Sequence, residues 1–189
     1  MRPTIGVLAF QGAFSKHVSM LQSLKVAVQP VRTLHDLKKC DALIIPGGES
    51  TTMAYHIDNS GMRDTLRDFA ENKPIFGTCA GMILLAREVV DGSVKSLGVL
   101  DISVERNGFG RQKDSFSTSI EVALSRSPQV FHSIFIRAPR IKECGEKVNI
   151  LAKLNEEAVL VQQNNCLAAT FHPELTDDPS IHKFFLKML

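Results

Sequence analysis

Apolar runs of strand length alternate with segments of helical period through the first half of the chain, and this alternation constrains the fold most. The runs lie at residues 5–10, 26–31, 42–45 and 74–77. Helices are predicted after them, at residues 14–24, 34–39, 51–57, 62–72 and 80–89. Continuously apolar strands are buried on both faces, as in a parallel sheet between two helical layers. The pattern therefore predicts a doubly wound, three-layer α/β fold.

The second half of the chain has strand-like runs without long helices between them. They lie at residues 97–105, 117–124, 134–136, 150–154, 159–163 and 167–171, and a last helix is predicted at residues 180–188. Asn164 and Asn165 separate two runs, and Asn tolerates the positive φ of a type I′ hairpin turn. We expect an antiparallel extension of a mostly parallel central sheet. Because no repeat or Pro/Gly-rich linker interrupts the sequence, residues 1–189 are expected to form one domain.

Composition excludes several classes of protein. A chain of 189 residues that is 44% apolar can bury its own core without disulfides. The 22 basic and 20 acidic residues leave a net charge of +2 without long runs of one sign, which argues against a nucleic-acid partner. No apolar run approaches the ~18 residues that cross a bilayer, and the amino-terminal run resembles a strand more than a signal peptide. We expect a cytoplasmic protein without a membrane partner.

Four cysteines are present, and their spacing predicts neither a disulfide scaffold nor a zinc site, since there is no C-x-x-C. No metal and no cofactor is expected. Cys40, Cys144 and Cys166 are interpreted as packing thiols. Cys79 is different because it lies between two glycines.

Residues 77–81, Gly-Thr-Cys-Ala-Gly, follow a predicted strand and precede a predicted helix. This pattern is typical of a nucleophile elbow, in which the neighbours two residues on either side must be small. Amides at the start of the helix would stabilise a thiolate, and the Ala80 amide would face an oxyanion formed during acyl attack. A free cysteine is more often a small buried hydrophobe, but Gly77 and Gly81 favour the nucleophile here.

A thiolate nucleophile needs a base, and one of the six histidines has a suitable setting. His172 follows a strong strand run and is followed, two residues later, by Glu174. At a strand end the two side chains would share a direction, so the carboxylate could orient the imidazole. An isolated H-x-E is usually a surface pair, and the hypothesis depends on the cysteine elbow.

The loop at residues 46–51, Pro-Gly-Gly-Glu-Ser-Thr, lies between a strand and a helix. Gly47 and Gly48 would let the backbone approach a ligand, and their amides could hold an anion or an oxyanion. A phosphate site is possible, although the loop lacks the Lys-Ser/Thr ending of a P-loop, and a simple capped turn is the plain alternative. Arg106 and Arg137, at strand ends, could clamp a carboxylate or be solvated surface residues.

Taken together, these segments resemble class I glutamine amidotransferase domains, and more closely the glutaminase subunits of pyridoxal 5'-phosphate synthases. The motifs that carry the resemblance lie at residues 8–12, 46–52, 77–81, 104–116, 136–139 and 171–176. Their order and number make the resemblance specific, and it extends from about residue 4 to the end of the chain.

The resemblance implies hydrolysis of L-glutamine to L-glutamate and ammonia, which passes to a TIM-barrel synthase subunit that makes the vitamin B6 cofactor. It implies that Cys79 attacks the amide, that His172 shuttles the proton and that Glu174 orients His172. The remaining implied positions are Gly48, Glu49, Ser50, Arg106, Ile136 and Arg137 for glutamine, and Gln11, Gly47, Gly48 and Ala80 for the oxyanion and for activation by the synthase.

Three alternatives remain open from the sequence. A glutaminase of another pathway, such as histidine biosynthesis, would share the triad but not residues 106–116. A protease or deglycase of the PfpI type often has histidine directly after the elbow cysteine, where this chain has Ala80. A regulatory subunit on the same fold could lose Cys79, His172 or Glu174, and all three are present.

Overall fold

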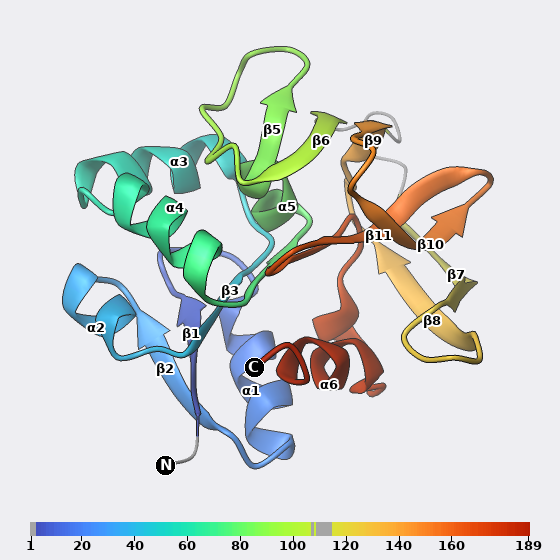
Figure 1. Ribbon diagram of the computed structural model, residues 1–189, viewed down its shortest axis with the longest axis horizontal. Helices are drawn as coiled ribbons and strands as arrows, with labels where there is room; N and C mark the ends of the chain where they lie inside the picture. Colours follow the sequence, from blue (N-terminus) through green and yellow to red (C-terminus); the bar gives the residue numbers. More distant parts are fainter. Residues whose placement is uncertain (1–2, 107, 109–114) are drawn as a thin grey trace.

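The computed structural model describes residues 3–106, 108 and 115–189 (Figure 1). Residues 107 and 109–114, which belong to the motif at residues 104–116, lie outside the described residues. The strands are β1 Thr4–Leu8, β2 Ala27–Val31, β3 Ala42–Ile45, β4 Ile75–Thr78, β5 Ala86–Val89, β6 Leu100–Glu105, β7 Phe116–Val122, β8 Gln129–Phe135, β9 Arg140–Cys144, β10 Asn149–Leu154, β11 Glu157–Gln163 and β12 Cys166–Ala169. The helices are α1 Phe14–Ser23, α2 Leu34–Lys38, α3 Ser50–Asn59, α4 Arg63–Asn72, α5 Ala80–Leu85, the 3₁₀ helix η1 Pro173–Leu175, and α6 Ser180–Leu186.

A central sheet organises the fold. Within the described part of the chain its strand order is β2-β1-β3-β4-β12-β11-β10-β7-β8. The pairs from β2 to β12 are parallel, and those from β12 to β8 are antiparallel. The predicted α/β fold, a mostly parallel sheet with an antiparallel extension, is therefore confirmed.

Two apolar cores lie on opposite faces of this sheet. Along β3, Leu43 and Ile45 belong to one core and Ile44 to the other, because alternate side chains of a strand point to opposite faces. The core that contains Leu43 packs against α2, α3, α4 and α5, and the core that contains Ile44 packs against α1 and α6. Figure 1 shows α1 and α6 side by side below the sheet, away from α3 and α4. The predicted three layers are present.

Not all the strands of the second half extend the central sheet. In the described residues β5, β6 and β9 form a separate three-stranded sheet, so the run predicted at residues 97–105 lies outside the extension. This small sheet packs its apolar side chains, including Val89, Ile102 and Val104, into the core of α3 to α5. The strand β9 was not predicted, because Arg140–Cys144 contains a single large aliphatic residue, Ile141.

The predicted helix at residues 80–89 is too long. Helix α5 ends at Leu85, and Ala86 adopts an extended conformation that begins β5. All six residues of α5 are buried, so no polar face marks its boundary. Val89 has the β-branched side chain that strands favour and pairs with Val104 of β6.

The hairpin predicted at Asn164 and Asn165 is present, since Gln163 of β11 pairs with Cys166 of β12. Only Asn164 of the two has a positive φ, 50°, so the predicted type I′ geometry is wrong. The strand predicted at residues 134–136 is longer, Gln129–Phe135. In the described residues no helix is long and apolar enough to cross a membrane.

Candidate active site

Cys79 occupies the sharp turn between β4 and α5. Its backbone has φ 51° and ψ −108°, a left-handed value of φ that an L-residue rarely adopts and that stores about 1–3 kcal/mol of strain. The turn is held because the Cys79 N–H donates to the carbonyl of Ala169 in β12, at 2.8 Å. The residue is 8% exposed, and its Sγ faces the carbonyl of Ile136 at 3.9 Å. This is the geometry of a nucleophile elbow.

The glycines beside the elbow allow close backbone contact. A Cβ at Gly77 would lie 2.6 Å from the backbone of Gly81, and one at Gly81 would overlap the carbonyl oxygen of Ile45 in β3. The two glycines therefore let α5 leave β4 directly against the sheet, which keeps the cysteine at the carboxyl edge of the parallel strands.

His172 and Glu174 meet next to the elbow. The Nδ1 of His172 lies 2.7 Å from Oε1 of Glu174, and both residues are buried. Their arrangement differs from the predicted one, because β12 ends at Ala169 and His172 is the residue before η1. The 3₁₀ turn, and not strand alternation, brings the carboxylate back to the imidazole.

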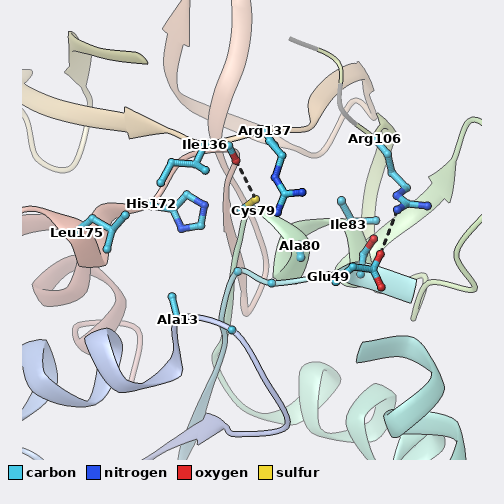
Figure 2. Close-up of a pocket in the computed structure, with 14 residues that line it drawn as sticks. Ala13, Glu49, Cys79, Ala80, Ile83, Arg106, Ile136, Arg137, His172 and Leu175 are labelled. Atoms are coloured by element: carbon cyan, nitrogen blue, oxygen red, sulfur yellow. Dashed lines mark hydrogen bonds and ion pairs between the residues drawn. The ribbon is translucent and has the colours of Figure 1, made fainter. Parts of the chain in front are cut away.

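A cavity of about 320 Å³ opens at this edge of the sheet (Figure 2). Of the predicted site residues, ten line it: Gly47, Gly48, Glu49, Ser50, Cys79, Ala80, Arg106, Ile136, Arg137 and His172. Glu174 lies behind His172, and Gln11 lies outside the lining. In Figure 2 Cys79 and His172 occupy one part of the cavity, and the pair of Glu49 and Arg106 another.

The cavity is also lined by four residues that the sequence did not predict to lie there: Gly12, Ala13, Ile83 and Leu175. Gly12 and Ala13 follow β1, and the carboxyl ends of parallel strands meet at one edge, so their position was open to prediction. Ile83 lies one helical turn after Ala80. Leu175 is placed by η1, which no pattern in the sequence indicated.

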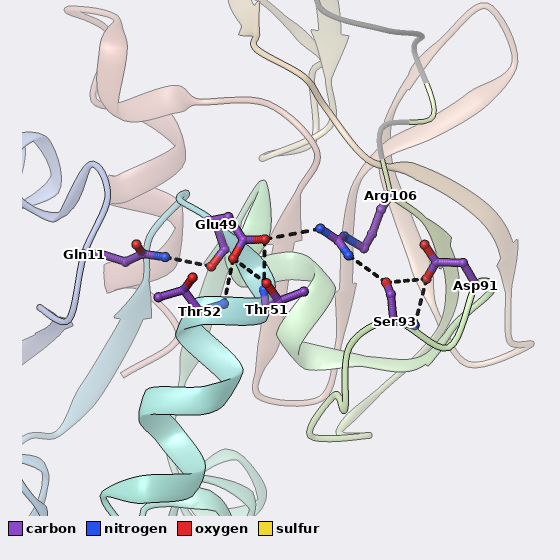
Figure 3. Close-up of polar contacts among 7 residues, drawn as sticks. All are labelled: Gln11, Glu49, Thr51, Thr52, Asp91, Ser93 and Arg106. Carbon is purple, nitrogen blue, oxygen red and sulfur yellow. Dashed lines mark hydrogen bonds and ion pairs between the residues drawn. The ribbon is translucent and has the colours of Figure 1, made fainter.

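A polar network joins the 46–51 loop to the small sheet (Figure 3). The carboxylate of Glu49 caps α3 by accepting from the amides of Thr51 and Thr52. Its Oε1 lies 3.2 Å from Nη2 of Arg106, whose Nη1 donates to Ser93 at 2.7 Å. Arg106 is therefore already paired with a carboxylate. Burial opposes ionisation of Glu49, but the hydrogen bonds from Thr51 and Thr52 lower the pKa of this carboxyl to about 2.

Backbone contacts fix the glycine loop itself. The Gly47 carbonyl accepts from the Ala13 N–H at 3.2 Å, and Gln11 Nε2 donates to the Glu49 carbonyl at 2.7 Å. A Cβ at Gly47 would overlap Cε1 of His172, so this peptide lies directly against the imidazole. The segment after β1 thus sets the position of the predicted oxyanion loop.

The environment of His172 favours its charged form. Burial works against the imidazolium, but interactions with the side chains of Cys79 and Glu174 raise the pKa of His172 to about 10. Burial also works against the Glu174 carboxylate, but the imidazoles of His17 and His172 lower the pKa of Glu174 below its usual value. The arrangement can hold a thiolate, an imidazolium and a carboxylate in series. Across the described ranges, no group of three or more His, Cys, Asp or Glu is arranged to hold a metal ion.

Comparison with known proteins matches the chain to one family. Residues 7–189 match the SNO glutamine amidotransferase family. The pyridoxal 5'-phosphate synthase subunit PdxT of Thermosipho africanus is 50% identical over 186 residues, which cover 98% of each chain. The protein of the same name from Francisella philomiragia is 46% identical over 188 residues, with 100% of each chain covered.

A solved structure described as a glutamine amidotransferase superposes with a TM-score of 0.91 at 45% identity, and 97% of each chain is covered. The elbow, the histidine–carboxylate pair and the glycine loop occur here on the fold that this structure shares. The family match covers almost the whole chain, and the chain therefore belongs to the SNO glutamine amidotransferase family.

Proposed function

We propose that the protein hydrolyses L-glutamine to L-glutamate and ammonia and delivers the ammonia to a TIM-barrel subunit of pyridoxal 5'-phosphate synthase, for vitamin B6 biosynthesis. The observation that carries the chemistry is Cys79 on its strained elbow, in one cavity with a His172 whose Nδ1 is held by Glu174 at 2.7 Å. The name of the relatives that share 46–50% of their residues with the chain supports the synthase as the partner.

The reaction has two stages. The Cys79 thiolate attacks the side-chain amide carbon, and His172 protonates the nitrogen, so that ammonia leaves and a thioester to Cys79 remains. His172, now neutral, takes a proton from water as the water oxygen attacks the thioester. Collapse of the intermediate releases glutamate and restores the Cys79 thiolate beside the His172 imidazolium, with the proton of the product carboxyl group passing to solvent. Glu174 stabilises the imidazolium in both stages.

Backbone amides would stabilise the negative charge on the attacked carbonyl oxygen. We assign this role to Gly48 and Ala80, which line the cavity beside Cys79. One such donor lowers the activation barrier by about 2.7–4 kcal/mol, so a misoriented Gly47–Gly48 peptide would slow the reaction strongly. Gln11, bound to the carbonyl of Glu49, is positioned to transmit synthase docking to this loop.

The remaining lining residues would bind the amino-acid end of glutamine. Glu49 and Ser50 belong to the glycine-loop segment of the lining, Arg106 pairs with Glu49, and Ile136 and Arg137 follow β8. Arg137 would pair with the α-carboxylate, since Arg106 is already bound to Glu49. We propose that residues 1–189 form one glutaminase domain, which works in the cytoplasm within a heteromeric complex.

The test is ammonia release from glutamine, measured with the purified synthase subunit present and absent. We expect Cys79→Ala to fold normally and to reduce ammonia release in the complex to background, because no other group can form the thioester. Cys144→Ala, at a half-buried thiol outside the cavity, is the matched control and should keep full activity. Ammonia release by the Cys79→Ala complex at the wild-type rate would overturn the proposal.

A further inference from the structure

Two buried histidines lie behind the candidate triad and have no part in the reaction as described. His17 of α1 and His182 of α6 are both 0% exposed. The Nδ1 of His17 lies 3.0 Å from Nε2 of His182, and the ring of Phe76 packs edge-on against both. Burying two imidazoles costs free energy unless their ring nitrogens are hydrogen-bonded.

His17 contacts both sides of the candidate site. Its Nε2 lies 3.4 Å from Oε2 of Glu174, the carboxylate oxygen that His172 does not use. The same Nε2 lies 3.1 Å from Oγ1 of Thr78, the residue directly before Cys79. His17 therefore lies between Glu174 and Thr78, the last residue of β4 and the neighbour of Cys79.

The hydrogen-bond partners select the tautomer of each ring. A bare Nε2 on His17 would place a lone pair against Glu174 Oε2 in a dry site, so Nε2 carries the proton and the neutral ring accepts at Nδ1. His182 then donates from Nε2, and its own Nδ1 is left bare. This agrees with the contacts, because His182 Nδ1 has no hydrogen-bond partner among the described residues, and an orphaned acceptor is tolerated better than an orphaned N–H.

Burial favours the neutral form of both rings. Burial lowers the pKa of His17 below its usual value, and burial and the neighbouring His17 lower the pKa of His182 to about 3. A neutral His17 directs its Nε2–H, hydrogen-bonded to Thr78 Oγ1, to within 3.4 Å of Glu174 Oε2 without cancelling the carboxylate charge, so the carboxylate keeps its attraction for the His172 imidazolium. Within the described structure Oε2 is a buried carboxylate oxygen without a hydrogen-bond partner, and the imidazole of His17 is a polar neighbour 3.4 Å away.

We propose that His17 is a positioning residue: it holds Glu174 through Oε2 against the end of β4, so that Oε1 stays aligned with His172, and His182 fixes its tautomer. The inference rests on the proposed function, which supplies the reaction. Loss of the His17 donor should leave glutamine binding intact and impair the steps that His172 performs.

Three variants at position 17 separate this role from packing. The amide nitrogen of His17→Gln reaches the place of Nε2, that of His17→Asn reaches only the place of Nδ1, and His17→Leu has no donor. In the complex with the synthase subunit we expect His17→Leu and His17→Asn to lower kcat about 10- to 100-fold, with KM for glutamine unchanged. Loss of a residue that orients a functional side chain has an effect of this size in metalloenzymes. His17→Gln should retain at least about one third of kcat.

Leu21→Ala is the matched control, because Leu21 is fully buried one turn further along α1 and belongs to the apolar core on that face of the sheet. It should lose stability without a change in kcat. Equal losses of kcat in His17→Gln, His17→Asn and Leu21→Ala would assign His17 to packing and overturn the inference, as would a wild-type kcat in folded His17→Leu.

A second measurement does not depend on glutamine. The rate of Cys79 alkylation by iodoacetamide, followed by peptide mass spectrometry of the free chain, reports the thiolate that the imidazolium stabilises. We expect a reduction of about tenfold or more in His17→Leu and His17→Asn, and less than threefold in His17→Gln. If wild type releases no ammonia but alkylation follows this order, the proposed function fails and the role of His17 stands. Equal alkylation rates in all variants overturn that role.

Discussion

The chemistry of the site depends on the charged form of His172, which two neighbouring side chains maintain. Its imidazole is buried, which alone would favour the neutral ring, and its charge is maintained by Cys79 on one side and Glu174 on the other. Glu174 in turn is buried and lies within reach of two imidazoles. The charge state of each of these two residues is therefore set by its neighbours, against the effect of its own burial.

Glu174→Gln removes the carboxylate charge and keeps the shape of the side chain. Because Glu174 helps raise the pKa of His172 to about 10, the variant should lower that pKa by about 1–3 units. NMR titration of the His172 ring protons measures it directly. Glu157→Gln, at the surface partner of Arg140, is the control and should leave the His172 titration unchanged. An unaltered midpoint in Glu174→Gln would contradict the assigned electrostatics.

Among the helices of the described structure, α5 is the one that is buried on every side. It has six residues, all buried, and starts from a residue with positive φ. Its position is set by contact with β3, since Gly81 lies against the Ile45 carbonyl. A short helix of this kind is stabilised by tertiary packing and not by its own propensity.

Gly81→Ala tests this dependence. The added methyl group overlaps backbone, which cannot move aside as a flexible side chain would, so we expect the free energy of unfolding to fall by about 1–3 kcal/mol or more. Urea denaturation at pH 7 measures it. Met82→Leu changes shape but not volume at the next, fully buried position and should cost less than about 1.5 kcal/mol. Equal stability of Gly81→Ala and wild type would show that α5 can shift away from β3.

The elements of the first half were predictable because each carries its own period. The boundary between α5 and β5 was not, since a helix buried on all sides has no amphipathic pattern. Arg140–Cys144 was missed because a strand of a small surface sheet needs few apolar residues. The placement of Cys79 followed from local glycines. The contact between His172 and Glu174 was predicted, but through the wrong geometry, and His17 was missed because its partner lies 157 positions away in the chain, a relation that no spacing in the sequence records.

For the whole molecule, the buried histidines limit the pH range of stability. His182 titrates near 6.5 when unfolded but near 3 when folded, so below pH 6.5 the unfolded state binds more protons. His172 is raised to about 10 by its partners, so between pH 6.5 and 10 the folded state binds more protons. Stability from these groups is therefore greatest near pH 6.5 and decreases on both sides.

We predict that the free energy of unfolding falls between pH 6.5 and 5, by at most about 1.4 kcal/mol per pH unit for each group. Urea denaturation at pH 5, 6.5 and 9 measures the profile. His182→Leu should make the acid side less steep, since the buried His17 remains, and leave the alkaline side unchanged, because it removes one buried imidazole and not the His172 pair. A wild-type profile that is flat from pH 5 to 6.5 would contradict the prediction.

The position of β12 in the sheet has a consequence for the order in which the protein matures. Cys166–Ala169 is the last strand of the chain, yet it lies between β4 and β11 and supplies the carbonyl that holds the Cys79 amide. During synthesis, about ninety residues after β4 must be made before β12 can pair with it. We therefore expect the turn at Cys79 to become ordered only after nearly the whole chain has left the ribosome, because an incomplete chain lacks the Ala169 carbonyl that holds the Cys79 amide.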